Sequence, residues 1–109
     1  MARRRPKYNA IKCEADGHKF DSKKERARYF ELKLLERTGQ ISELVLQPKY
    51  PLMINKTVVA RYISDFEYKD KTGALITEDV KSEITRKQPV YRLKNKMFAA
   101  QFGRAIKET

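Results

Sequence analysis

The stretch "KTVVARYISDFEYKDKTGALITEDVKSE", residues 56–83, decides the fold. Its first half is rich in Val, Tyr, Ile and Phe, which predicts a β-strand. The segment "KDKTG" (69–73) turns the chain, and residues 74–83 return as a second, antiparallel strand. If the two strands pair around this turn, Asp65 lies opposite Asp79. The hairpin is therefore expected to bring two acids from neighbouring strands together.

The returning strand gathers an unusual number of charges. Because the side chains of a strand alternate between its two faces, one face carries Ile76, Glu78 and Val80, and the other carries Thr77, Asp79 and Lys81. Asp79 and Lys81 are then neighbours, a carboxylate beside an ammonium. They form either a surface ion pair, worth at most about 1 kcal/mol, or half of a metal-dependent active site. Glu78 is the alternative second acid, but it shares the face of Val80, which should point to the core.

Two elements are expected before these strands. Residues 8–20 predict a short hairpin around the turn dipeptide Asp16-Gly17. Residues 21–39 predict a helix that begins at Ser22, with Glu25 completing a capping-box pattern, and ends at Gly39. The apolar stripe expected on its inner side consists of Ala27, Phe30 and Leu34, widened by Leu35.

The remaining segments complete an α/β pattern. Residues 41–52, "ISELVLQPKYPL", predict a strand broken by Pro48 and Pro51. Residues 86–103 predict a second helix, with Pro89 in its first turn and Gly103 at its end. Its expected inner stripe is Val90, Leu93, Met97 and Ala100, and residues 104–108 predict a fourth short strand. After the N-terminal hairpin the order is αβββαβ. A helix between the last two strands favours a parallel crossover, so we expect a mixed sheet flanked by two helices.

Length and composition narrow the class of protein. A chain of 109 residues predicts one domain, here residues 8–109, preceded by a flexible basic arm at residues 1–7. A formal net charge of +11 favours a polyanionic partner such as nucleic acid. No apolar run is long enough to span a membrane, and the basic start lacks the apolar segment of a signal peptide. A cytoplasmic protein is expected.

Cysteine and histidine chemistry is largely excluded. The chain has one cysteine, Cys13, and one histidine, His18, which rules out an internal disulfide and a Cys/His zinc site. A Cys–His catalytic pair would need a group that activates it, and the neighbouring sequence offers none.

The paired acids instead point to a divalent cation. Asp65 lies in an otherwise apolar strand, where burying an unpaired acid is costly. Two carboxylates as close as Asp65 and Asp79 repel one another unless a cation lies between them. Oxygen ligands suit Mg²⁺ or Mn²⁺, which can activate water and stabilise charge on a phosphodiester. The backbone carbonyl of Val80 is expected as a further ligand, and Lys81 as the group that orients the nucleophile or holds a phosphate oxygen.

These residues resemble a known motif. "SD" at 64–65 followed by "DVK" at 79–81 is similar to the PD-(D/E)xK nuclease motif, with Ser64 in place of its proline. Asp65 matches the first acid, Asp79 the second, and Lys81 the lysine. Glu25, in "FDSKKE", matches the acid that many members carry on the first helix. Glu25 has a second interpretation as the capping-box acid alone, and it can also serve in both roles.

The αβββαβ order matches the common core of that superfamily, restriction-endonuclease-like, over nearly the whole chain. "FDSKKE", "QPKY" and "YRLKNK" together resemble a phage-encoded group of its small members. The resemblance implies a Mg²⁺-dependent endodeoxyribonuclease of DNA recombination in a phage-infected bacterium, with Mn²⁺ as a substitute and Gln47 close to the site. Small size and basic charge suggest a homodimer acting on branched DNA, similar to Holliday junction resolvases. The alternatives are a general nicking nuclease of phage recombination, and a non-catalytic nucleic-acid-binding protein in which these charged residues are structural.

Basic residues crowd the start and outer face of the second predicted helix. Without interleaved acids they repel one another, and a phosphate backbone would relieve that repulsion. A solvated helix face is the alternative. The predicted DNA contacts, which position the duplex without reading bases, are Arg86, Lys87, Arg92, Lys94 and Lys96, together with Arg3, Arg4 and Arg5 of the arm.

Overall fold

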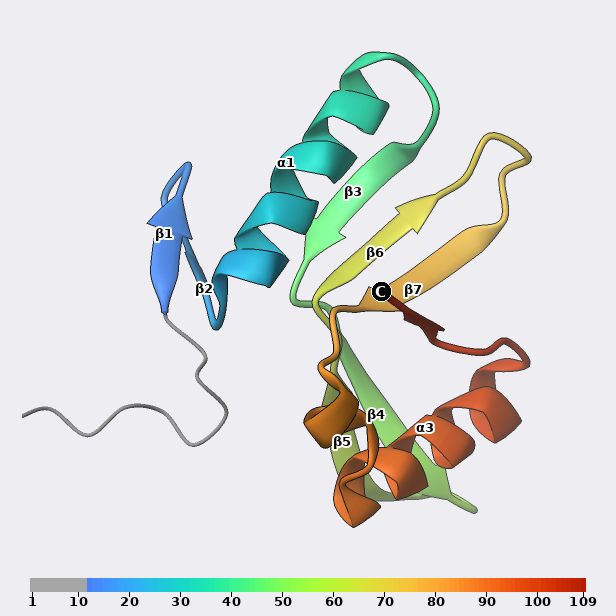
Figure 1. The fold of residues 1–109 in the computed structure, drawn as a ribbon. Coiled ribbons are helices and arrows are strands. Elements are labelled where there is room, and N and C mark those ends of the chain that lie inside the picture. Colours follow the sequence, from blue (N-terminus) through green and yellow to red (C-terminus); the bar gives the residue numbers. More distant parts are fainter. Residues whose placement is uncertain (1–11) are drawn as a thin grey trace, which may run out of the picture.

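The computed structural model describes residues 12–109 (Figure 1). The predicted arm, with Arg3, Arg4 and Arg5, lies outside the described residues, as do residues 8–11 of the predicted hairpin. The rest of that hairpin is confirmed, with β1 (Cys13–Ala15) antiparallel to β2 (His18–Phe20). Asp16 and Gly17 form its turn, both with positive φ, the backbone that a two-residue hairpin turn requires.

Helix α1 (Lys23–Arg37) begins and ends where the sequence predicts. The Ser22 hydroxyl accepts the Glu25 N–H at 3.1 Å, and Gly39 follows the last turn with φ 81°. The Glu25 carboxylate accepts the N–H of Asp21 at 3.2 Å, one residue before the position that a capping box uses. This carboxylate therefore stabilises the start of the helix while pointing toward the sheet.

The predicted apolar stripe of α1 is wrong for Ala27, Phe30 and Leu34, which are exposed, and right for Leu35, which packs against the core. Phe30 and Leu34 are 51% and 57% exposed, whereas the buried residues of the helix are Glu25, Tyr29 and Leu32. The buried face of α1 is the one that carries Tyr29 and the polar groups that pair with buried charges of the sheet. The spacing of aliphatic residues alone does not predict which face this is.

The four strands that follow α1 form one long hairpin bent in the middle. Its outer parts, β3 and β6, belong to the main sheet, and its inner parts, β4 and β5, pair only with each other. Gln47, with φ 52°, and Pro48 lie at the bend, where Gln47 N–H donates to Asp65 O at 2.9 Å and Ser64 N–H to Pro48 O at 3.1 Å. Pro51, predicted as a second break, lies inside β4, because one missing N–H is tolerated in a two-stranded ribbon. The strands are β3 (Ser42–Leu46), β4 (Lys49–Ile54), β5 (Thr57–Ile63) and β6 (Phe66–Lys69).

The main sheet is mixed, as predicted, with the order β3-β6-β7-β8. Strand β7 (Leu75–Asp79) is antiparallel to β6, with Phe66 opposite Glu78. The next position in this register sets Asp65 opposite Asp79, which confirms the predicted hairpin. The last strand, β8 (Lys107–Glu108), runs parallel to β7 after a helical crossover.

Two helices lie between β7 and β8, where one was predicted. The extra one is the short α2 (Glu83–Arg86), and α3 (Pro89–Phe102) has Pro89 in its first turn and Gly103 after its end. Three residues of the predicted inner stripe of α3, Val90, Leu93 and Ala100, are exposed, so the prediction is wrong for them, whereas Met97 packs against the core as predicted. The buried residues are Tyr91 and Phe98, since aromatic rings span the distance between the helix and the β4–β5 ribbon.

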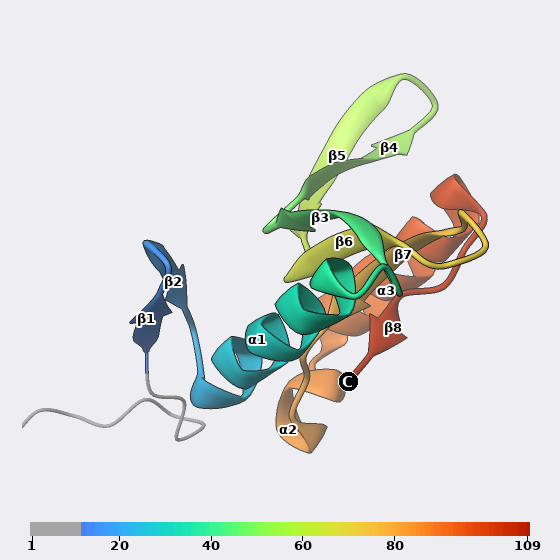
Figure 2. The same ribbon diagram turned by 90° about the horizontal axis from the view of Figure 1, so that it is seen from above.

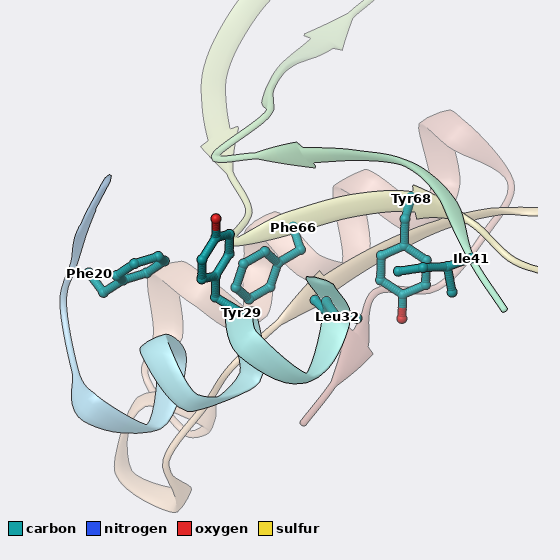
Figure 3. Packing of buried hydrophobic residues seen from close by; sticks show 6 residues of the cluster. All are labelled: Phe20, Tyr29, Leu32, Ile41, Phe66 and Tyr68. Atoms are coloured by element: carbon teal, nitrogen blue, oxygen red, sulfur yellow. The ribbon is translucent and has the colours of Figure 1, made fainter. Parts of the chain in front are cut away.

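The bend divides the core into two clusters. The first packs α1 against the main sheet (Figure 3) and consists of Phe20, Tyr29, Leu32, Ile41, Phe66 and Tyr68. The second packs α3 against the β4–β5 ribbon, which projects away from the main sheet (Figure 2), and consists of Tyr50, Leu52, Tyr62, Tyr91, Phe98 and Ile106. No helix within residues 12–109 is long and apolar enough to cross a membrane.

Candidate active site at the bend of the sheet

Three carboxylates interact through their charges at the place where the bend, the end of β7 and the start of α1 come together. Asp65 lies at the bend, Asp79 ends β7, and Glu25 reaches in from the first turn of α1. Asp79 and Glu25 are only 1% and 5% exposed. The fold therefore brings together the three acids that the sequence predicts.

Burial and mutual repulsion perturb these acids strongly. Burial, then the charge of Asp79 and a hydrogen bond to it, then the charge of Glu25, raise the pKa of Asp65 to about 9. Burial, with smaller contributions from the charges of Asp21 and Asp79, raises the pKa of Glu25 to about 7. Near neutral pH, Asp65 therefore keeps its proton and is hydrogen-bonded to Asp79. Such strongly shifted groups are concentrated at functional sites.

Each acid also has a fixed protein partner. One Asp65 oxygen (Oδ2) accepts the N–H of Val80 at 2.7 Å. Oδ2 of Asp79 accepts the hydroxyl of Tyr62 and lies 3.2 Å from the ammonium of Lys81. A backbone N–H therefore holds Asp65 in place, and a tyrosine of the second core cluster holds Asp79.

Lys81 is fixed at both its backbone and its side chain. Its N–H donates to Thr109 O at 3.0 Å, and its carbonyl accepts from Lys24 Nζ at 3.1 Å. Its ammonium lies 4.4 Å from the centre of the Tyr91 ring. Because Asp79 is almost fully buried, the Asp79–Lys81 contact is not the solvent-exposed pair of the alternative interpretation.

Glu78 points to the opposite side of the sheet and has a different role. Arg28 binds it with two nitrogens, Nε at 2.6 Å and Nη2 at 2.9 Å, and the Tyr68 hydroxyl donates to it at 2.5 Å. Burial raises the pKa of Glu78, but the Arg28 guanidinium and the Tyr68 hydroxyl outweigh it, so the pKa lies below its ordinary value. Glu78 is therefore the buried half of a structural ion pair.

The acids do not form a ready-made ligand cluster. Within residues 12–109, no three His, Cys, Asp or Glu side chains are grouped so that they could hold a metal ion. The expected ligands Asp65, Asp79 and Glu25 interact through their charges, and Val80 contacts Asp65 through its N–H. The ligand role of the Val80 carbonyl stays a prediction.

Comparison with known proteins assigns the chain to a family. Residues 5–109 match the family model described as "Protein of unknown function (DUF1064)". The chain belongs to the DUF1064 family. Neither a curated protein nor a solved structure matches it significantly. The match spans every residue of the candidate site, so the site lies within the DUF1064 domain.

The predicted DNA contacts of this DUF1064 chain fall into two groups. Lys87 pairs with Glu83 at 3.5 Å, and Arg86 lies 4.0 Å from Glu108. No acid is interleaved among residues 86–96, but two of these cations lie near acids outside that range, one four residues earlier in the chain and one on β8. Lys94 donates a hydrogen bond to the carbonyl of Arg61 at 2.8 Å and so links α3 to β5. These three residues form the first group, whose charges already have partners within the protein.

Arg92 and Lys96 line a hollow of about 210 Å³. Its other lining residues are Arg86, Tyr91, Asn95 and Glu108. The Tyr91 ring forms a wall of this hollow and also contacts the ammonium of Lys81. One aromatic side chain thus connects a cation-rich hollow to the acids of the DUF1064 site.

Sequence reasoning missed Tyr62, Tyr91 and Arg28 as parts of the site or its support. Tyr62 precedes Asp65 by three residues, and only the bend brings its hydroxyl to Asp79. A signal for Arg28 was present, because a buried strand acid such as Glu78 requires a cation on the helix that covers it. Gln47, expected near the site, holds Asp65 through its backbone rather than its side chain.

Proposed function

We propose that this protein is a metal-dependent endonuclease that hydrolyses phosphodiester bonds in DNA. The observation that carries the proposal is the convergence of three mutually repelling carboxylates, the buried Glu25 and Asp79 and the half-buried Asp65, beside Lys81, whose ammonium contacts Asp79. The order of helices and strands, together with the resemblance to PD-(D/E)xK nucleases, supports the same assignment.

The donor set fits a hard divalent cation. Carboxylate oxygens are the ligands that Mg²⁺ and Mn²⁺ prefer. Burial first, and the neighbouring carboxylates after it, raise the pKa values of Glu25 and Asp65, and a bound divalent cation would oppose both effects. Asp65, Asp79 and the carbonyl of Val80 would hold the ion, with Glu25 beside it. When bound, such an ion supplies an activated water and stabilises charge on the phosphoryl group.

The protein's own groups would position the reactants. The ammonium of Lys81 contacts the Tyr91 ring and Asp79. On the side away from Asp79 it would orient a water or a phosphate oxygen. The Tyr62 hydroxyl fixes the orientation of Asp79. Glu25, with a pKa of about 7, is suited to accept a proton near neutral pH.

DNA is the proposed substrate because of charge. The chain carries a net charge of +11, and Arg86, Arg92 and Lys96 line the cation-rich hollow. A phosphate in that hollow would place the neighbouring phosphodiester over the carboxylates. Branched DNA, a homodimer with two sites, and a role in phage recombination inside a bacterial cell follow from the resemblance and belong to the proposal.

The test is cleavage of labelled four-way-junction, linear-duplex and single-stranded DNA in Mg²⁺ and in EDTA. We expect the wild type to cut in Mg²⁺ alone. Asp79→Asn should bind DNA at least as well, because it removes a negative charge, and should cut more slowly by orders of magnitude. Lys81→Ala should be slowed severely while retaining its metal. Equal cleavage by wild type and Asp79→Asn, or cleavage that survives EDTA, would refute the assignment.

A second candidate is a non-catalytic DNA-binding protein. It is favoured by one observation, that residues 12–109 hold no ready-made cluster of metal-ligating side chains. Asp65, Asp79 and Lys81 would then be structural. Salt-sensitive DNA binding with no cleavage of any substrate in Mg²⁺ or Mn²⁺ would decide for this candidate.

A further inference from the structure

A second hollow, of about 390 Å³, lies on the other side of the bend. It sits among the β1–β2 hairpin, α1 and β3, where the hairpin stands apart from the main sheet (Figure 2). The lining residues used below are His18, Lys19, Lys33, Leu44, Leu46 and Gln47. Neither the predicted acids nor the predicted DNA contacts lie in it.

The lining combines two cations with two leucines. Lys19 and Lys33 contribute ammonium groups, Leu44 and Leu46 contribute apolar surface, and no acid is among the described residues that line the hollow. Two acids border the lining: Glu36 lies 3.5 Å from Lys33 and accepts the N–H of Leu44, and Asp16 accepts the hydroxyl of Tyr29. A phosphate attached to a flat, largely apolar base matches this combination of groups.

Size restricts the ligand further. A volume of about 390 Å³ is near the lower end of the roughly 300–1,000 Å³ of small-molecule sites. A single nucleotide fits such a hollow, and a DNA duplex does not. The His18 ring, which lies edge-on to Tyr29 with 5.9 Å between ring centres, adds an aromatic surface at the opening.

Gln47 connects this hollow to the acids. Its side-chain amide donates to the carbonyl of Lys19 at 3.4 Å, and its N–H donates to the carbonyl of Asp65 at 2.9 Å. Its backbone is held at φ 52°, a conformation that non-glycine residues adopt rarely. Gln47 therefore links the hollow directly to the bend that carries Asp65.

We propose that this hollow binds one unpaired nucleotide of a DNA strand whose backbone crosses the acids. Lys19 and Lys33 contact its phosphate, and its base lies against Leu44, Leu46 and the His18 ring. The inference rests on the proposed function and narrows the substrate to DNA with an unpaired nucleotide beside the scissile bond, such as a flap, a tailed end or an open junction. A blunt duplex leaves the hollow empty.

The first test uses the absence of tryptophan from the sequence. His18→Trp introduces a single fluorophore at the opening of the hollow, and Val58→Trp places one on the exposed surface of β5 as a control. Both variants are titrated in EDTA with a blunt duplex and with the same duplex carrying a short single-stranded tail, 5′ or 3′. We expect a tail of one polarity to quench His18→Trp strongly, the blunt duplex to leave it nearly unchanged, and Val58→Trp not to discriminate between the DNAs.

The second test measures affinity. The wild type should bind the tailed duplex about tenfold more tightly than the blunt one, the lower part of the range for one stacked base. Lys19→Ala/Lys33→Ala should lose this preference. The control Lys56→Ala/Lys71→Ala, which removes the same charge from two exposed turns, should weaken binding to both DNAs equally and keep the preference.

The outcomes separate the two proposals. Blunt-duplex binding with no preference for either tail, or equal quenching by both DNAs, would overturn the nucleotide site and leave the nuclease proposal intact. Tail preference without cleavage in Mg²⁺ or Mn²⁺ would support the nucleotide site and overturn the nuclease proposal. Failure of the wild type to bind any DNA would overturn both.

Discussion

Binding of Mg²⁺ should release protons from the carboxylates at the bend. Asp65, with a pKa of about 9, and Glu25, with a pKa of about 7, must both lose their protons before they can bind a cation or its waters as carboxylates. At pH 7.5 a group with a pKa of about 9 is almost fully protonated, and one with a pKa of about 7 holds about a quarter of a proton. We therefore expect release of about 1.2 protons per ion at pH 7.5.

The sign and size of the effect depend on pH in a defined way. As pH rises through the raised pKa of Asp65, the free protein loses that proton by itself, so release should fall to about 0.1 proton per ion at pH 10. As pH falls below 7, protons compete with the metal and the affinity for Mg²⁺ should decrease. Asp65→Asn removes the larger contribution, so about 0.2 proton should remain at pH 7.5 in any Mg²⁺ binding that this variant retains.

Calorimetric titration of Mg²⁺ in HEPES and in Tris at pH 7.5 measures the number directly, because the two buffers take up protons with different enthalpies. Lys71→Ala, in an exposed turn away from the site, is the matched control and should release as many protons as the wild type. Binding of Mg²⁺ without proton release, or equal release by wild type and Asp65→Asn, would refute the proposed ligand set.

Three further perturbations test other parts of the structure. Glu25→Gln should slow cleavage at least tenfold while changing the free energy of unfolding by at most about 1 kcal/mol, and unchanged cleavage in a gel assay would mean that Glu25 is only a helix cap. Arg28→Ala should lower the free energy of unfolding by about 3–5 kcal/mol at pH 7, because it leaves Glu78 charged and buried without its partner. Arg28 holds the pKa of Glu78 below its ordinary value, so the stabilisation is present above that value and is lost as pH falls through the lowered pKa. The loss in urea unfolding should therefore shrink at pH 4, and an equal loss at both pH values would contradict the ion-pair assignment. Arg92→Ala/Lys96→Ala should weaken DNA binding about equally for all sequences and reduce the slope of log affinity against log salt by about 2; an unchanged slope would place the phosphate contacts elsewhere.

The sequence by itself determined most of the elements and the pairing of β6 with β7, but neither the short helix α2 nor the division of the central strands at the bend. The turn at residues 69–73 and the alternation along β7 are local features, and together they set the register that brings Asp65 opposite Asp79. Helix ends were equally predictable, because Ser22, Gly39, Pro89 and Gly103 act within one turn of their own positions. Asp79 and Lys81 could be placed together for the same reason.

Only the tertiary structure decided which faces are buried and what supports the acids. The spacing of aliphatic residues predicted Phe30 and Leu34 as the inner face of α1, yet Tyr29 and Leu32 are buried. The buried face is the one from which Arg28 can pair with the buried Glu78 of the sheet. This pairing joins residues 50 positions apart in the chain, so the periodicity of neither element predicts it.

The bend is the clearest case. Pro48 marks a break in the strand, but no local rule says that the break turns β4 and β5 toward α3. That turn brings the hydroxyl of Tyr62 to Asp79 and the Tyr91 ring to Lys81. The pKa shifts of Glu25 and Asp65 follow from the same packing, since burial and the approach of like charges from three separate elements exist only once the chain has folded.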